Sequence, residues 1–159
     1  MESVKEDHGR DQAAASMKNI RKMIDRLEHA RRCDDIQCDL PDEEILDGLD
    51  VYSKSATEEH REQYHDEDNA LQQILEYPLS VQFRSDWHNP DEKPEDAEFE
   101  ILLTTGGPAV KIVGDLNSDG EPCRAWLEYQ DWFVPWKEYF GEMRDSRYLL
   151  EFAQELIAR

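Results

Sequence analysis

The sequence predicts an α+β fold, in which a four-stranded antiparallel meander carries a C-terminal helix on one face and follows a helical, acidic N-terminal segment. Apolar residues recur with helical spacing in much of the first half, the period changes to two from Leu79, and helical spacing returns near the C-terminus. The 159 residues are enough for one domain of ordinary size. We therefore describe the chain as a helical segment, 1–77, and an α+β domain, 78–159.

Residues 12–32 are expected to form an amphipathic helix. Its apolar stripe consists of Met17, Ile20, Ile24 and Leu27, and its other face is basic, with Lys18, Arg21, Lys22 and Arg26. Because a lone helix of this length is marginal and the stripe is too apolar to face water, we expect it to make a protein contact. The contact would lie within the chain, for example with the later acidic helix, or in a homodimer through helix 12–32.

Two further helices are expected before the sheet. Pro41 suits the first turn of a short helix that runs through Leu49, and Asp39 is a candidate cap for it. A longer helix should run from about Thr57, the expected N-cap, to Tyr77, with an apolar stripe only in its second half.

The next segments have the character of strands. Apolar residues alternate with polar ones from Leu79 to Phe83, which is typical of a half-buried strand. Three more strands, rich in apolar and β-branched residues, are expected at 99–105, 109–116 and 124–130. Short turns at Gly106 and Gly120 join these three and make them antiparallel. Residues 146–158 should form the closing helix.

Composition excludes several function classes. The 38 acidic side chains outnumber the 18 basic ones, and the formal net charge is -20. That balance argues against direct binding to nucleic acid, which needs Lys and Arg for its phosphates, and against anionic membranes. No apolar run reaches the roughly 18 residues of a membrane span, and the first residues do not read as a signal peptide. With three cysteines, we expect a reducing, cytoplasmic location.

The acidic excess is concentrated in the middle of the chain. Residues 34–100 carry 22 acidic and 4 basic side chains, whereas residues 1–33 have a net charge of +2. Such a run is either a solvated surface or a surface that imitates nucleic-acid phosphates and binds a basic groove. The residues expected to bind a partner are Asp42, Glu43, Glu44, Asp47, Asp50, Glu58, Glu59, Glu62, Asp66, Glu67 and Asp68.

Residue spacing does not indicate catalytic chemistry, a cofactor or a metal site. Cys33 and Cys38 are not accompanied by a second Cys or His pair at the spacing of zinc-finger ligands. His60 and His65 would lie on different faces of one helix and so could not bind one ion together. Cys123 is expected to be a small buried residue. We therefore expect a binding protein and not an enzyme, with no cofactor and no metal site.

The stretch 129–140 is unusually aromatic, with six of the 15 aromatic residues of the chain. Such density indicates either a plug in the core between the sheet and the last helix or an exposed anchor for a partner. The anchor would consist of Trp132, Phe133 and Trp136. The need of a highly charged domain for large apolar side chains favours the plug.

The sequence of residues 78–140 resembles a family of small, uncharacterised proteins of bacteriophages and prophages. The resemblance is carried by PLSV at 78–81, by EILLTTGGPAV at 100–110, and by RAWLEYQDW at 124–132 followed by Pro135 and Trp136. It implies an origin on mobile genetic elements and does not imply a mechanism.

Two functions follow as expectations. The first is a phage- or prophage-encoded inhibitor that binds a basic, nucleic-acid-binding groove of a host defence complex, of the anti-CRISPR or anti-restriction type, by nucleic-acid mimicry. The alternative is a structural or accessory phage protein whose acidity only keeps it soluble.

Overall fold

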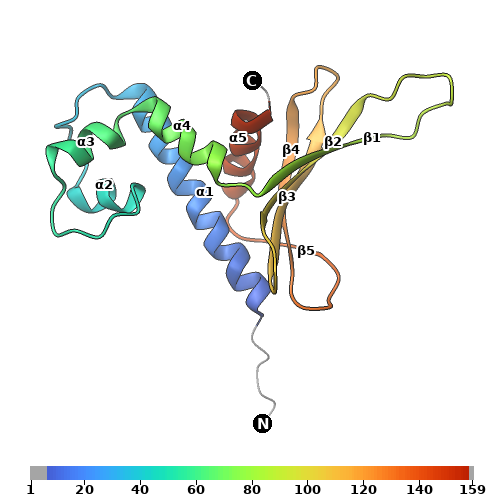
Figure 1. Ribbon diagram of the computed structural model, residues 1–159, viewed down its shortest axis with the longest axis horizontal. Coiled ribbons are helices and arrows are strands. Elements are labelled where there is room, and N and C mark those ends of the chain that lie inside the picture. The colour runs from blue at the N-terminus through green and yellow to red at the C-terminus, as the bar shows by residue number, and fades with distance from the viewer. Residues whose placement is uncertain (1–6, 158–159) are drawn as a thin grey trace, which may run out of the picture.

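The computed structural model describes residues 7–157, which form an α+β arrangement of five helices and one sheet (Figure 1). The helices are α1 (His8–Arg32), α2 (Asp42–Gly48), α3 (Glu58–Tyr64), α4 (Glu67–Glu76) and α5 (Asp145–Ile157). The strands are β1 (Ser80–Ser85), β2 (Asp96–Thr104), β3 (Ala109–Leu116), β4 (Pro122–Gln130) and β5 (Lys137–Glu138). None of the described helices combines the length and the apolar character that a membrane span requires.

The sheet is an antiparallel meander with the strand order β1-β2-β3-β4-β5. Ile101 of β2, Ile112 of β3 and Leu127 of β4 lie opposite one another and point to the same, buried face. The four expected strands are confirmed, but the prediction of a four-stranded sheet was wrong. The fifth strand has only two residues, which pair with Glu128 and Tyr129, and two residues are too few to produce a periodic pattern.

One hydrophobic core lies between the sheet and the helices. Helices α1 and α5 pack on the same face of the sheet (Figure 1), and α4 packs against both of them. The stripe Met17, Ile20, Ile24 and Leu27 is 0–2% exposed and belongs to this core, as do residues of β2, β3, β4 and α5. The core therefore includes residues on both sides of the boundary drawn between 77 and 78. The contact expected for helix 12–32 is made within the chain, and the stripe needs no second copy to cover it.

The acidic helix expected at 57–77 is two helices. Thr57 is the N-cap of α3 as predicted, and its hydroxyl accepts a hydrogen bond from the amide of His60 at 3.2 Å. The break falls at Asp66, whose carboxylate accepts from the amides of Asp68 and Asn69 and so starts a new helix. An aspartate that caps its own downstream turn competes with continuation of the helix. For α2, Pro41 and not Asp39 is the N-cap residue.

Candidate functional sites on the acidic lobe

Residues 34–68, which we call the acidic lobe, comprise α2, α3, the first turn of α4 and their connections. They lie at one end of the molecule, opposite the β1–β2 hairpin (Figure 1). The buried apolar side chains of the lobe are Ile45, Leu46 and Tyr64, and they lie outside the main core. The lobe carries 14 acidic and two basic side chains, a net charge of -12. Polar and charged contacts must therefore contribute much of what holds it.

The structure divides the predicted partner-binding carboxylates into two groups. Four of them have internal tasks: Asp42 binds Arg61 at 2.7 Å, Asp47 binds Lys22 at 2.8 Å, Glu67 binds Arg31 at 3.0 Å, and Asp66 caps α4. The other seven are exposed, and within the described part of the chain they make no ion pair: Glu43, Glu44, Asp50, Glu58, Glu59, Glu62 and Asp68.

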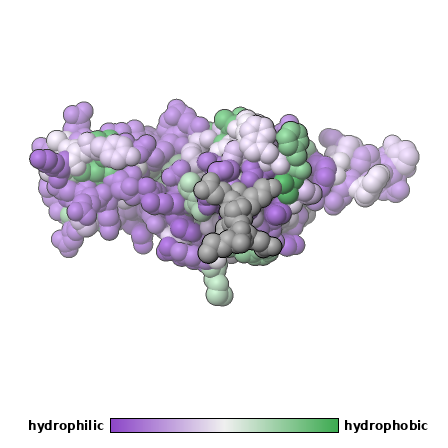
Figure 2. Space-filling model, turned by 90° about the horizontal axis from the view of Figure 1, so that it is seen from below, coloured by the Kyte–Doolittle hydropathy of each residue, from purple (hydrophilic) through white to green (hydrophobic). Residues whose placement is uncertain are grey.

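The outer face of the sheet provides a contrast. There the carboxylates are matched by cations: Arg84 pairs with Glu98, and the ammonium group of Lys111 lies 3.3 Å from Glu100 and 3.9 Å from Glu128. The acidic lobe has no such compensation for its seven exposed carboxylates among the residues from 7 to 157. Seen from below, the end of the molecule that carries α2 and α3 is mostly hydrophilic (Figure 2).

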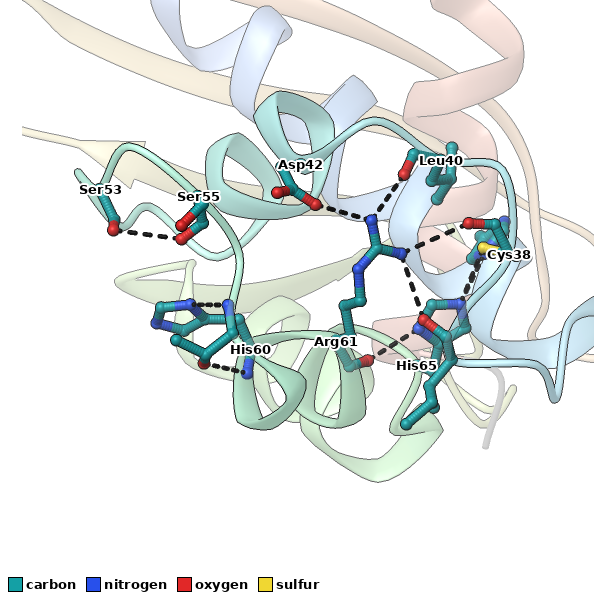
Figure 3. Close-up of polar contacts among 11 residues, drawn as sticks. Cys38, Leu40, Asp42, Ser53, Ser55, His60, Arg61 and His65 are labelled. Carbon is teal, nitrogen blue, oxygen red and sulfur yellow. Dashed lines mark hydrogen bonds and ion pairs between the residues drawn. The ribbon is translucent and has the colours of Figure 1, made fainter.

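Arg61 of α3 holds the loop before α2 in place (Figure 3). Its guanidinium group donates to the carbonyl oxygens of Ile36, Cys38 and Leu40 at 3.2, 3.4 and 2.9 Å, and to the carboxylate of Asp42. That bond to Arg61 holds the pKa of the Asp42 carboxyl below its usual range. A single side chain thus joins α3 to four polar groups, one on every second residue from Ile36 to Asp42.

Two histidines and two cysteines meet where α1, this loop and α3 come together. His29 lies in the last turn of α1, and Cys33 is the C-cap residue of the same helix. Cys38 lies in the loop, and His65 is the C-cap residue of α3. One ligand atom from each residue lies within 4.8 Å of the other three, and all four side chains are half-buried.

The imidazole nitrogens of this cluster are oriented toward its centre. Nε2 of His29 lies 3.0 Å from Nε2 of His65, and Sγ of Cys38 lies 3.6 and 3.3 Å from the same two nitrogens. Nδ1 of His65 lies 2.7 Å from the carbonyl oxygen of Arg61, to which it donates (Figure 3). This bond leaves Nε2 of His65 as the nitrogen with a lone pair. Burial, together with the neighbouring His65 and Arg32, lowers the pKa of His29 and favours its neutral form.

The sequence analysis did not predict this cluster of two histidines and two cysteines and expected no metal site. His60 does lie apart from the cluster, since its Nδ1 accepts from the amide of Thr57 at 3.1 Å. The residue that the sequence analysis did not consider is His29, which lies one helical turn before Cys33. The signal that could have found it is the run His29, Cys33, Cys38, because residues i and i+4 share a helix face and two cysteines separated by four residues are a usual zinc-ligand spacing. Cys123, expected to be buried, is exposed.

The aromatic stretch does not form the expected core plug as a whole, because Tyr129 lies in the core and Tyr139 packs against it, but Trp132, Phe133 and Trp136 do not belong to the core. Trp132 is 60% exposed and Phe133 is fully exposed, while Trp136 is half-buried and lies under the ammonium group of Lys111, 4.1 Å from the ring centroid. The physical reason is that α1 and α5 already fill the buried face of the sheet. The loop between β4 and β5 therefore turns outward, with Phe133 at a φ of 56°. The three residues predicted as an anchor lie in this loop, apart from the acidic lobe (Figure 1).

Comparisons of the chain with protein-family models, with curated proteins and with solved structures give no match.

Proposed function

We propose that this protein acts by binding, and that its acidic lobe docks on a basic, nucleic-acid-binding groove of another protein and thereby inhibits it. The observation that carries the proposal is the set of seven exposed carboxylates without a cationic partner in the described chain. Six of them lie on α2, α3 and α4, and Asp50 lies in the turn after α2. The resemblance to phage proteins makes a bacterial defence complex, such as a CRISPR effector or a restriction enzyme, the proposed target.

The physical argument is one of uncompensated charge on an ordered surface. Carboxylates on helices need no ordering when a partner binds, whereas a disordered acidic tail loses conformational entropy. A lobe with a net charge of -12 also attracts a basic groove before contact, over a screening length of about 8 Å at physiological salt. The partner's lysines and arginines would supply the pairing that this chain lacks.

A second function, a phage accessory protein with a merely solubilising surface, predicts that only net charge matters. The test is therefore a charge-matched comparison. In one variant Glu43, Glu58, Glu59 and Glu62, which are exposed and bind no internal cation, become glutamine. The control variant removes the same number of charges outside the lobe, by neutralising four exposed carboxylates: Asp86, Asp91, Glu95 and Glu138.

The readout is the plating efficiency of a sensitive phage on bacteria that carry a CRISPR or restriction system and express the full chain. We expect the wild type and the control variant to raise plating by at least tenfold, and the lobe variant to lose that effect. Equal behaviour of the two variants, or no protection by the wild type against either kind of system, would contradict the proposal.

A further inference from the structure

We infer that His29, Cys33, Cys38 and His65 form a structural zinc site that ties the acidic lobe to α1. The inference does not depend on the proposed function, because it concerns how the lobe is held and not what the lobe binds. It depends on the positions of four ligand atoms from three separate segments of the chain.

Three of the distances between the ligand atoms lie within about 0.3 Å of those in a tetrahedral zinc site. With Zn–N near 2.0–2.1 Å and Zn–S near 2.3 Å, a tetrahedron separates two nitrogens by about 3.3 Å and a nitrogen from a sulfur by about 3.6 Å. The nitrogens of His29 and His65 are 3.0 Å apart, and Sγ of Cys38 lies 3.6 and 3.3 Å from them. Sγ of Cys33 completes the set, with all four atoms inside 4.8 Å.

Hydrogen bonds alone do not account for the cluster equally well. Nδ1 of His65 donates to the carbonyl oxygen of Arg61, so Nε2 of His65 has one lone pair. That lone pair faces both Nε2 of His29 and Sγ of Cys38, at 3.0 and 3.3 Å, and it can accept only one proton. A cation at the centre would bind all of these atoms at once.

The chemistry of the donors selects the metal. Two thiolates and two imidazoles in a four-coordinate arrangement suit Zn²⁺, whereas Ca²⁺ and Mg²⁺ require oxygen ligands. Four protein ligands leave no open position for water or substrate, which is the mark of a structural and not a catalytic site.

Arg61 supports the site from outside the ligand set. Its carbonyl oxygen orients the ring of His65, and its guanidinium group holds the carbonyl oxygen of Cys38 at 3.4 Å (Figure 3). Hydrogen bonds of this kind around a metal fix the tautomer and the direction of the ligands. Ligands from the loop and from α3 are thus positioned by the same residue.

The lobe has a physical need for such a cross-link. Its buried apolar side chains are Ile45, Leu46 and Tyr64, a small core for 35 residues, and its exposed carboxylates repel one another. Small units with so little core are commonly held by a metal or a disulfide. Zinc would join the end of α1, the loop at Cys38 and the end of α3, and so set the position of the carboxylates that α2 and α3 present.

The test begins with the full chain, purified under reducing conditions from cells grown with added zinc. Mass spectrometry of the metal content should give one zinc ion per chain. Co²⁺ titrated into the metal-free chain should show the visible bands of tetrahedral coordination and the near-ultraviolet charge-transfer band of a cobalt–thiolate bond, and Zn²⁺ should displace both. Absence of zinc from the wild type together with absence of these bands would overturn the inference.

Variants separate the site from other thiols and imidazoles. Cys38→Ser and His65→Gln should lose the metal and the charge-transfer band or weaken it at least tenfold in Co²⁺ affinity. The matched controls Cys123→Ser and His88→Gln, which change exposed residues outside the cluster, should bind as the wild type does. Loss of the bands in the controls, or their retention in both cluster variants, would contradict the assignment.

The structural role has its own readout. Amide hydrogen exchange of the wild type, with Zn²⁺ and after its removal by a chelator, should show protection of residues 34–66 falling at least tenfold. The protection of the amides of β2, β3 and β4 should not change. Equal protection of the lobe in both states would overturn the role given to zinc, and neither this measurement nor the metal analysis requires a partner.

Discussion

Arg26 illustrates how a single charged residue can organise the join between three helices. Its side chain is 2% exposed, although it belongs to the basic set of α1 that the sequence suggested would face outward. The guanidinium group donates to the carbonyl oxygens of Gln63 and Tyr64 and to the side chains of Asn69 and Gln73, at 2.6–3.4 Å. Burial lowers its pKa from that of a free arginine, and no acidic side chain binds it directly among these contacts. Neutral acceptors thus satisfy a buried cation.

Replacing Arg26 should destabilise the folded state. Arg26→Met keeps much of the volume but leaves the acceptors on α3 and α4 without donors, and each unsatisfied buried group costs about 1–3 kcal/mol. We expect the free energy of unfolding to fall by roughly 3 kcal/mol or more, measured by urea denaturation. Arg32→Met, at an exposed position of the same helix, should change it by less than about 0.5 kcal/mol. Equal stabilities of the two variants would contradict this role of Arg26.

Asp145 is a second buried charge with a measurable consequence. It binds Arg21 through two bonds of 2.8 and 3.0 Å and accepts a hydrogen bond from the amide of Glu142. Burial opposes ionisation, but these bonds prevail and hold the pKa of Asp145 below its ordinary value. A carboxyl with a depressed pKa in the folded state stabilises the fold above its unfolded-state pKa, and this stabilisation is lost as the pH falls through the folded-state pKa.

Asp145→Asn should therefore reduce stability at neutral pH by roughly 2–3 kcal/mol. The difference from the wild type should begin to shrink below about pH 4, where the carboxyl of the unfolded chain becomes protonated, and should disappear as the pH falls through the lower folded-state pKa. Thermal melts between pH 3 and 7 measure this, with Glu138→Gln as an exposed control. A difference that did not depend on pH would show that the ion pair is not its source.

At the scale of elements, α1 is the helix on which the rest of the fold depends. It packs against β3, β4, α4 and α5 and carries Arg21, Arg26 and Arg31, which bind α5, the α3–α4 join and both α4 and α5, respectively. Its predicted stripe is confirmed as buried. The α+β domain 78–159 accordingly shares one core with the helical segment that precedes it.

A chain that begins at residue 34 should consequently fail to fold. Removing α1 exposes the apolar side chains that cover the sheet, at about 1.5–3 kcal/mol for each large one, and the sum exceeds the stability of a typical domain. Circular dichroism should show no cooperative melt for residues 34–159. A peptide of residues 8–33 added in trans should restore it, and a cooperative melt without the peptide would disprove this dependence.

The aromatic loop between β4 and β5 should behave in the opposite way. Because Trp132 is 60% exposed, Trp132→Ala should change the free energy of unfolding by less than about 1 kcal/mol. Phe152→Ala in α5, where the side chain is fully buried, should cost roughly 3–5 kcal/mol. Urea denaturation of both variants compares an exposed with a buried aromatic residue, and a large loss for Trp132→Ala would restore the core-plug interpretation.

At the scale of the whole molecule, the dominant feature is an uneven charge distribution. The acidic lobe carries a net charge of -12 out of -20, although the positive residues of α1 neutralise part of it at Asp47 and Glu67. Repulsion among the remaining carboxylates opposes folding of the lobe. A surface that is costly to maintain and unmatched within the chain agrees with the binding role proposed for it.

This repulsion predicts a dependence on salt. Raising NaCl from about 0.02 to 0.5 M shortens the screening length from about 20 to about 4 Å and should raise the melting temperature of the wild type. The lobe variant Glu43→Gln, Glu58→Gln, Glu59→Gln, Glu62→Gln should melt higher at low salt and respond less to NaCl. If neutralising the control set, Asp86, Asp91, Glu95 and Glu138, has the same effect, the repulsion is spread over the molecule and is not specific to the lobe.

The sequence by itself determined the local features of this protein. The spacing of Met17, Ile20, Ile24 and Leu27 specified a buried helix face, and Thr57 specified a helix start, as the structure confirms. An alternating segment and three apolar, β-branched runs specified four strands. Each of these depends on residues within one or two turns of each other, so side-chain spacing and capping chemistry are enough to define them.

Only the tertiary structure decided which distant residues meet. His29 and His65 are separated by 36 positions, and Arg26 by a similar distance from its acceptors, so their contacts depend on how the chain closes between them. The same holds for the exposure of Trp132 and Phe133, which follows from α1 and α5 filling the buried face of the sheet. The local sequence pattern does not show which elements will cover a given surface of the sheet. That choice decides whether a side chain such as that of a cysteine, a histidine or a tryptophan is placed at a site, in the core or on the exposed surface.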